Sequence, residues 1–119
     1  MVIVPSFDDP DIIAGQGTIG LELMRQAGVL GAAFDVVVAP IGGGGLMAGL
    51  STAVKALSPS TAIVGVEPEG FDDTLRSLQK GEPINIKPTT RSLCDALESP
   101  APGELTFPGR DRHYLDHFN

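Results

Sequence analysis

Four consecutive glycines, Gly42, Gly43, Gly44 and Gly45, form the stretch of this sequence most suited to chemistry. Because glycine has no Cβ atom, the backbone of such a stretch can approach a ligand closely, and its N–H groups can converge on the oxygens of a phosphate. Flexible glycine linkers lie among Ser, Thr and charged residues, whereas this stretch lies between the apolar segments VVVAPI and LMAGL. The pattern predicts a phosphate-binding loop, here called the glycine loop. The alternative is a tight strand-to-helix connection that binds no ligand.

A predicted strand and a predicted helix flank the glycine loop and would position it. Residues 35–39 before the loop are mostly apolar, as in a buried strand. Apolar residues after the loop recur on one helical face, at Leu46, Met47, Leu50, Ala53, Val54 and Leu57. The free N–H groups and the positive dipole end at the start of this helix would both favour a bound phosphate.

A second apolar strand is predicted at residues 62–66, after the helix. Strand, helix and strand in this order form a βαβ unit, which implies parallel strands and a right-handed crossover. We therefore predict an α/β fold, an open parallel sheet with helices on both faces. A short helix is expected at residues 74–79, beyond an acidic loop.

Two glycines nearer the start of the chain, Gly15 and Gly17, predict a second glycine turn. Thr18 can cap a helix that follows this turn, because its hydroxyl oxygen can accept a hydrogen bond from a free helical N–H group. Gly28 is expected to end that helix.

Composition limits the classes of function. The chain has 119 residues, enough for one domain, and a net charge of −7 with only eight Lys and Arg, which argues against binding to nucleic acid or to an anionic membrane. An anionic ligand would have to be held by backbone N–H groups. The chain has no apolar run long enough to span a bilayer and no signal-peptide pattern, so we expect a cytoplasmic protein. A single cysteine, Cys94, excludes an internal disulfide and fits a reducing compartment.

The glycine loop also fits a relaxed dinucleotide-binding pattern. Gly43-x-Gly45-x-x-Ala48 matches the glycine spacing, and Glu67 follows about 20 residues on, where a carboxylate would bind a ribose hydroxyl. Neither Lys-Ser nor Lys-Thr follows the glycines, so the loop is not of the P-loop type. An NAD-binding unit of an oxidoreductase is therefore one alternative.

Three segments in a fixed order indicate a second possibility. The segments FDDPDIIAGQGTIGLEL, VVVAPIGGGGLMAGL and VGVEPEGFDD together resemble the serine/threonine dehydratase family, which includes serine racemases. These are pyridoxal-phosphate enzymes of the tryptophan-synthase-β fold type. The resemblance covers residues 4–107, more loosely from residue 87. It divides the chain into part of a large cofactor-binding domain, residues 1–108, and a divergent tail, residues 109–119.

The resemblance implies roles for two groups of residues. The four glycines of the glycine loop and Leu46 match the positions that bind the cofactor phosphate. Glu67, the Phe71 carbonyl and Asp73 match positions that carry a divalent cation in several relatives. Three oxygens spaced in this way after a strand end can converge on a hard cation such as Mg²⁺, Mn²⁺ or Ca²⁺. The alternative for these residues is a solvated acidic loop.

The resemblance also implies a reaction and partners. The parent enzyme would eliminate water from L-threonine or L-serine and give a 2-oxo acid and ammonia, or would racemise serine. Its partner would be a small amino-acid substrate, with no nucleic acid and no membrane, and the enzyme would be a homo-oligomer.

The catalytic lysine of the family has no match in this sequence. In the family, a Ser-x-Lys segment supplies the lysine that forms the Schiff base, and an Asn-containing loop holds the substrate. This chain contains only Lys55, Lys80 and Lys87, and none matches that position. The resemblance therefore implies an internal piece of the large domain that is inactive alone. A non-catalytic phosphate-binding remnant is the remaining alternative.

Overall fold

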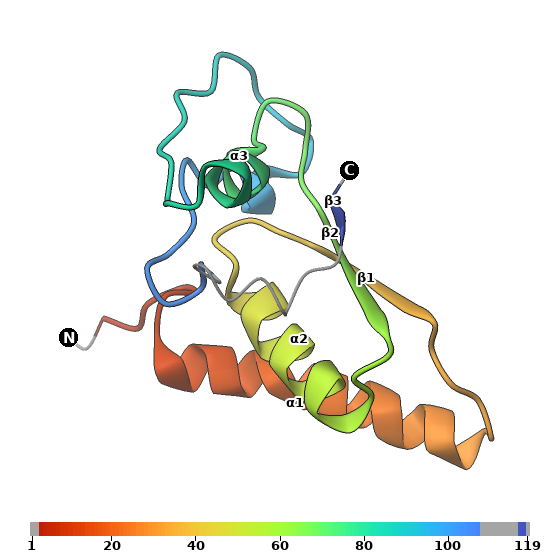
Figure 1. Ribbon diagram of the computed structural model, residues 1–119. Helices are drawn as coiled ribbons and strands as arrows, with labels where there is room; N and C mark the ends of the chain where they lie inside the picture. The colour runs from red at the N-terminus through yellow and green to blue at the C-terminus, as the bar shows by residue number, and fades with distance from the viewer. Residues whose placement is uncertain (1–2, 108–116, 119) are drawn as a thin grey trace.

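The computed structural model describes residues 3–107 and 117–118. Its helices and strands follow one another in the order α1 (Pro10–Val29), β1 (Val36–Pro40), α2 (Gly45–Leu57), β2 (Ala62–Val66), α3 (Asp73–Lys80), a 3₁₀ turn (Asp95–Leu97) and β3 (His117–Phe118). Figure 1 shows α1 and α2 lying together at the bottom of the molecule and α3 near its top.

A parallel sheet in the order β1-β2-β3 forms the centre of the fold. The predicted strand at residues 62–66 is confirmed, and the strand predicted at residues 35–39 lies one residue later. Pro40 stays in the ladder opposite Val66 because the next N–H, that of Ile41, donates to the Val66 carbonyl at 2.8 Å. The α/β class is confirmed. Because the strands are parallel, the loops after β1 and β2 leave the sheet at the same edge.

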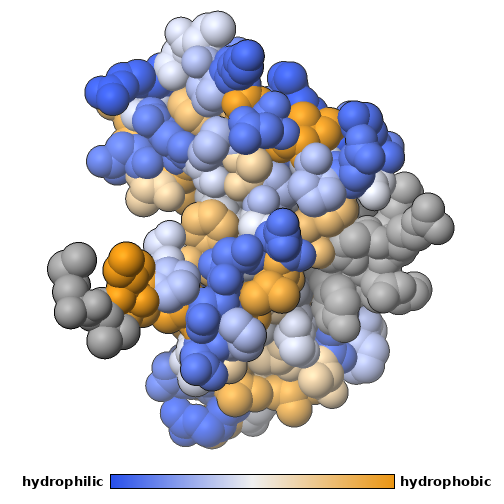
Figure 2. Space-filling model, turned by 90° about the vertical axis from the view of Figure 1, so that its left-hand side faces the viewer, coloured by the Kyte–Doolittle hydropathy of each residue, from blue (hydrophilic) through white to orange (hydrophobic). Residues whose placement is uncertain are grey.

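Hydrophilic residues gather over the upper part of the face shown in Figure 2, the level at which α3 lies in Figure 1. Hydrophobic residues lie along part of the lower edge of this face and also between the hydrophilic residues of its upper part. In the part of the chain that the structure describes, no helix combines the length and the apolar character needed to cross a membrane.

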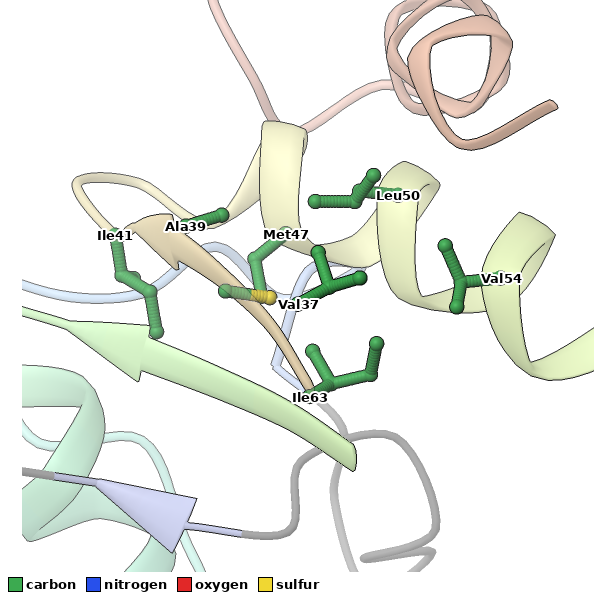
Figure 3. Packing of buried hydrophobic residues seen from close by; sticks show 7 residues of the cluster. All are labelled: Val37, Ala39, Ile41, Met47, Leu50, Val54 and Ile63. Atoms are coloured by element: carbon green, nitrogen blue, oxygen red, sulfur yellow. The ribbon is translucent and has the colours of Figure 1, made fainter. Parts of the chain in front are cut away.

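The hydrophobic core lies between α2 and one face of the sheet (Figure 3) and contains Val37, Ala39, Ile41, Met47, Leu50, Val54 and Ile63. Alternation along β1 directs Val37 and Ala39 into this core. Val36 and Val38 alternate with them and face the other way, and these two side chains remain 48% and 61% exposed. Helix α1 packs against α2 and brings Leu23 and Met24 to the margin of the core.

The second glycine turn predicted at Gly15 and Gly17 is wrong, because α1 continues through both residues. The helix begins earlier, where Oδ1 of Asp9 accepts hydrogen bonds from the N–H groups of Asp11 and Ile12 at 2.9 and 3.2 Å. Pro10 takes the first helical position, for which its fixed φ is suited.

The cap predicted at Thr18 and the helix end predicted at Gly28 are also wrong. Thr18 lies inside α1, and its hydroxyl donates to the Gly15 carbonyl at 2.7 Å. The helix continues to Val29. Gly31, with φ of 64°, then supplies the left-handed residue that ends it.

The upstream glycines allow the two helices to pack closely. A Cβ atom added at Gly20 would lie 2.8 Å from Cβ of Ala53, and one added at Gly49 would lie 2.6 Å from the backbone N of Gly17. The atoms that a Cβ at Gly49 would meet belong to the backbone of α1, and moving them would require a shift of the whole helix. The same residue type that predicts a turn therefore serves here as a helix contact.

Substituting alanine at Gly49 should destabilise the fold. The added methyl group meets backbone atoms of Ile13 and Gly17, so we expect Gly49→Ala to lower the free energy of unfolding by about 1–3 kcal/mol. Gly15→Ala is the matched control, because a Cβ there has no neighbour within 4 Å, and it should stabilise α1 by about 0.5–1 kcal/mol. Urea unfolding followed by circular dichroism measures both. Equal stability of Gly49→Ala and the parent chain would contradict close helix packing.

Candidate functional site

The glycine loop connects the end of β1 to the start of α2, as predicted. Gly44 is the N-cap residue of α2, with φ of 93° and ψ of −5°, a left-handed conformation that residues with a side chain rarely adopt. The Gly44 carbonyl accepts the first helical hydrogen bond, from Ala48 N at 2.9 Å. No side chain caps α2. The first N–H groups of this helix, which lack intrahelical partners, are therefore available to a ligand.

A pocket of 680 Å³ lies against the glycine loop. It is lined by Ser6, Phe7, Pro40, Gly42, Gly43, Gly44, Gly45, Leu46, Ala96, Leu97, Glu98, Ser99, Pro100, Ala101 and Pro102. All five residues predicted to bind a cofactor phosphate are in this set. Residues 96–102, which are distant from the glycine loop in sequence, also line this pocket.

The pocket offers an anion no cationic side chain. Among the described residues that line it, Glu98 alone carries a charge, and its carboxylate accepts a hydrogen bond from Ser92 N. A phosphate group in this pocket would rely on the backbone N–H groups of the glycine loop and on the positive end of the α2 dipole.

Protein atoms occupy the space that side chains in the glycine loop would need. A Cβ at Gly43 would meet the Phe7 ring, and a Cβ at Gly44 would lie 2.9 Å from Cβ of Thr106. Close packing by itself therefore requires glycine at both positions. The free helical N–H groups and the adjoining pocket are the features that indicate a ligand.

The residues that hold the glycine loop in place were not identified from the sequence. The Thr106 hydroxyl donates to the Gly43 carbonyl at 2.6 Å. The Asp8 carboxylate accepts from Glu104 N at 3.1 Å and from Leu105 N at 2.8 Å. These partners are separated by 63 to 97 residues, so no local pattern could have revealed them.

The acidic loop after β2 brings two of the predicted cation ligands close together. Both carboxylate oxygens of Glu67 accept hydrogen bonds, from Thr74 N and Leu75 N at 2.9 Å each, and so cap the start of α3. Asp73 is only 1% exposed, and its Oδ2 is buried without a hydrogen-bond partner. Phe71, whose carbonyl was the third predicted ligand, is buried in the same loop.

The unpartnered oxygen has an electrostatic consequence. Burial, followed by the nearby charge of Glu67, raises the pKa of Asp73 to about 7. Burial also raises the pKa of Glu67, against the lowering effect of the two backbone N–H groups that it accepts. Across residues 3–107 and 117–118, no three His, Cys, Asp or Glu residues form a metal-binding group. A cation here would therefore need a backbone carbonyl such as that of Phe71.

Comparison with known proteins identifies the family. The model of the family described as "Pyridoxal-phosphate dependent enzyme" matches residues 1–117 of the chain. The chain belongs to this family. The L-threonine dehydratase catabolic TdcB of Escherichia coli (strain K12) is 42% identical over 108 residues, which are 89% of this chain and 31% of that protein. The L-threonine ammonia-lyase of Thermotoga maritima is 44% identical over 108 residues, 89% of this chain and 25% of that protein.

Solved structures of the family share the fold. The crystal structure of a threonine deaminase from T.th. has a TM-score of 0.88 and 52% identity, covering 94% of this chain and 37% of that one. Maize serine racemase has a TM-score of 0.85 and 36% identity, covering 98% of this chain and 33% of that one. The resemblance to threonine dehydratases and serine racemases is thus confirmed. This chain spans only 25% to 37% of the length of these relatives.

Membership of the pyridoxal-phosphate family also bears on the other expectations. The family match favours pyridoxal phosphate over NAD, and both oxygens of Glu67, the expected ribose-binding carboxylate, already accept hydrogen bonds from N–H groups of α3. The boundary between residues 1–108 and the tail 109–119 stays a prediction, since most of the tail lies outside the described residues. Of the tail, residues 117–118 form β3, which pairs with β2.

The pKa of Asp73 predicts how stability depends on pH. The folded-state pKa of about 7 lies above the usual 3.8, so the native state holds this proton more tightly than the unfolded state does. The stabilisation is fully present below about pH 4 and is lost as pH rises through 7, a change on the order of 4 kcal/mol at most. Asp73→Asn cannot titrate. Urea unfolding from pH 4 to 8, with a chelator present, should show the parent chain losing stability relative to this variant. Parallel curves would contradict the assignment.

Proposed function

We propose that this chain forms the phosphate-anchoring part of a pyridoxal-phosphate dependent ammonia-lyase. The observation that carries the proposal is the glycine loop at the start of α2. Gly44 is left-handed there, the helix has no side-chain cap, and the adjoining pocket has no Lys or Arg among its described lining residues. Gly42, Gly43, Gly44, Gly45 and Leu46 would hold the phosphate through backbone N–H groups. When bound, the cofactor supplies an electron sink for the reacting carbon.

The proposed substrate is a small amino acid that carries a hydroxyl group on its third carbon. Relatives of similar identity are named for threonine (42%), for L-threo-3-hydroxyaspartate (41%, Saccharomyces cerevisiae) and for phenylserine (45%, Ralstonia pickettii). These compounds share the hydroxyl that leaves as water. L-Threonine and L-serine are the candidates for this protein, with 2-oxo acid and ammonia as products. Racemisation of serine is the second candidate, favoured by the likeness to maize serine racemase.

The lysine that holds the cofactor covalently is, in this proposal, not among these 119 residues. Lys55 lies near the end of α2, with its Nζ 3.5 Å from the Pro59 carbonyl, and Lys80 pairs with Glu82 at 2.6 Å. Neither these nor Lys87 lines the pocket. The chain would supply binding and orientation, and other parts of the enzyme would move protons.

The proposed partners follow from the family and from the surface. The amino-acid substrate and further copies of the enzyme are expected, whereas nucleic acid and membrane are not, given the net charge of −7. The exposed valines on the outer face of β1 are apolar surface that a further layer or copy would cover.

The phosphate site can be tested by substitution at Gly44. Pyridoxal phosphate and inorganic phosphate should bind the chain, and Gly44→Asp should weaken both by at least about tenfold through Cβ bulk and added negative charge. Gly81→Asp is the matched control, because Gly81 is also left-handed, with φ of 84° and open space around a Cβ. Titration calorimetry measures affinity, and circular dichroism monitors folding. If the folded Gly44→Asp variant binds phosphate and pyridoxal phosphate as tightly as the parent chain does, the glycine loop is not the phosphate site. Tighter binding of NAD⁺ than of pyridoxal phosphate would favour the oxidoreductase alternative.

We further propose that Glu67, the Phe71 carbonyl and Asp73 bind a divalent cation. The buried, unpartnered Oδ2 of Asp73 supports this proposal, because a cation would satisfy it and offset the repulsion between the two carboxylates. Mg²⁺, Mn²⁺ or Ca²⁺ at millimolar concentration should raise the melting temperature by mass action. Asp73→Ala should abolish the increase, whereas Glu69→Ala, on an exposed neighbour, should preserve it. If none of the three cations changes the melting temperature, the cation site is wrong. The acidic loop would then hold a proton on Asp73 and would serve only to begin α3.

The isolated chain should not turn over substrate. Elimination requires an amine positioned beside the cofactor to move the α-proton, and none of the three lysines lines the pocket. A coupled assay for 2-oxobutyrate or pyruvate, with saturating pyridoxal phosphate, should give no signal above buffer. Borohydride reduction and mass spectrometry provide the second measurement. Sustained 2-oxo acid production, with a pyridoxyl adduct on Lys55, Lys80 or Lys87, would overturn this expectation.

A further inference from the structure

Two hydrogen bonds from the turn at residues 103–106 hold the Gly43 carbonyl of the glycine loop. The Gly43 carbonyl accepts a hydrogen bond from the Thr106 hydroxyl at 2.6 Å and a second from Gly103 N at 3.3 Å. Neither Thr106 nor Gly103 lines the pocket. The Gly43 carbonyl is therefore directed toward the turn formed by residues 103–106.

The hydrogen bond to the Gly43 carbonyl also fixes the direction of the Gly44 N–H group, because both groups belong to one planar peptide unit. The peptide bond between Gly43 and Gly44 is trans, as are all those the structure describes, so its C=O and N–H point in opposite directions. Fixing the Gly43 carbonyl on Thr106 therefore directs the Gly44 N–H the opposite way. Gly44 itself lines the pocket, so this N–H is a candidate donor to a phosphate bound there.

The hydroxyl of Thr106 can donate in only one direction. Its oxygen accepts a hydrogen bond from Gly103 N at 3.0 Å, and its single proton goes to the Gly43 carbonyl. The side chain is closely confined, since Thr106 is 7% exposed. A Cβ at Gly103 would meet the carboxylate of Asp8 and lie 2.8 Å from Oγ1 of Thr106.

Asp8 fixes the turn that carries this threonine. Its carboxylate accepts from the backbone N–H groups of Glu104 and Leu105 at 3.1 and 2.8 Å. The next residue, Asp9, caps α1. Two adjacent aspartates thus tie the start of α1 to the 103–106 turn, and the turn holds the glycine loop through Thr106.

We propose that Asp8 and Thr106 are positioning residues that set the conformation of the glycine loop for phosphate. The inference rests on the proposed function for the identity of the ligand, but the loop conformation can be measured without any ligand. A merely structural role would lower stability and leave the N–H groups of residues 42–45 as ordered as before.

Thr106→Val tests the proposal, because it keeps the shape of the side chain and removes both hydrogen bonds. In the ligand-free chain, amide hydrogen exchange and ¹⁵N relaxation should show faster exchange and greater mobility at residues 42–45. Affinity for inorganic phosphate and pyridoxal phosphate should fall about tenfold. Thr106→Ser, which retains the hydroxyl, should restore both readouts to within about twofold of the parent. Asp8→Asn, with a weaker acceptor, should shift them in the same direction as Thr106→Val.

Thr61→Val is the matched control. Thr61 is 0% exposed, and its hydroxyl donates to the Phe34 carbonyl at 2.8 Å, but it precedes β2 at the end of the sheet away from the glycine loop. This variant should lower the melting temperature as much as Thr106→Val without loosening the glycine loop.

The outcomes separate the two proposals. If folded Thr106→Val keeps an ordered glycine loop, or if Thr61→Val loosens it equally, the positioning role is wrong. If the parent chain binds no phosphate while Thr106→Val still loosens the glycine loop, the positioning role stands and the proposed function fails.

Discussion

The close packing of α1 on α2 is the constraint on which the rest of the structure depends. Glycines at the crossing let the two backbones approach until an added Cβ would meet backbone atoms. Because α1 begins directly after Asp8 and Asp9, and α2 begins at Gly45, the last residue of the glycine loop, fixing the two helices also fixes the loop relative to Asp8. The site is thus positioned by a contact that involves none of the ligand-facing groups.

The parts of the fold that could be predicted from the sequence are those in which the signal is local. The strand at residues 62–66 and the glycine loop leading into α2 follow from apolar runs and a helical period within a few residues. The turn predicted at Gly15 and Gly17 was wrong because glycine occurs both in turns and at close contacts between helices. Only the contact of Gly17 with Gly49, on the other helix, distinguishes the two cases. The roles of Asp8 and Thr106 could not be predicted for a related reason, since each residue bonds to a segment more than sixty residues away.

In the acidic loop, the carboxylate of Glu67 has two effects on its surroundings. Glu67 satisfies two free N–H groups at the start of α3, and its charge contributes to raising the pKa of the buried Asp73. Residue types alone could predict that these carboxylates converge, but not whether a proton, a cation or a helix end compensates them. Geometry assigns the helix end to Glu67. The oxygen left over on Asp73 is the part of the loop that a proton or a cation would have to satisfy.

The apolar sequence of β1 fits a strand that is covered on both faces, although the described residues cover only one. A run such as VVVA is typical of a strand covered on both faces, yet only Val37 and Ala39 are buried, against α2. Val36 and Val38 lie on the open face, and the relatives that share this fold are about three times as long. The apolar pattern of the strand is therefore suited to the complete family fold. Exposing Val36 and Val38 on the outer face of β1 costs hydrophobic stabilisation that a covering layer would recover. For this reason β1, although central to the site, contributes less to stability here than its sequence allows.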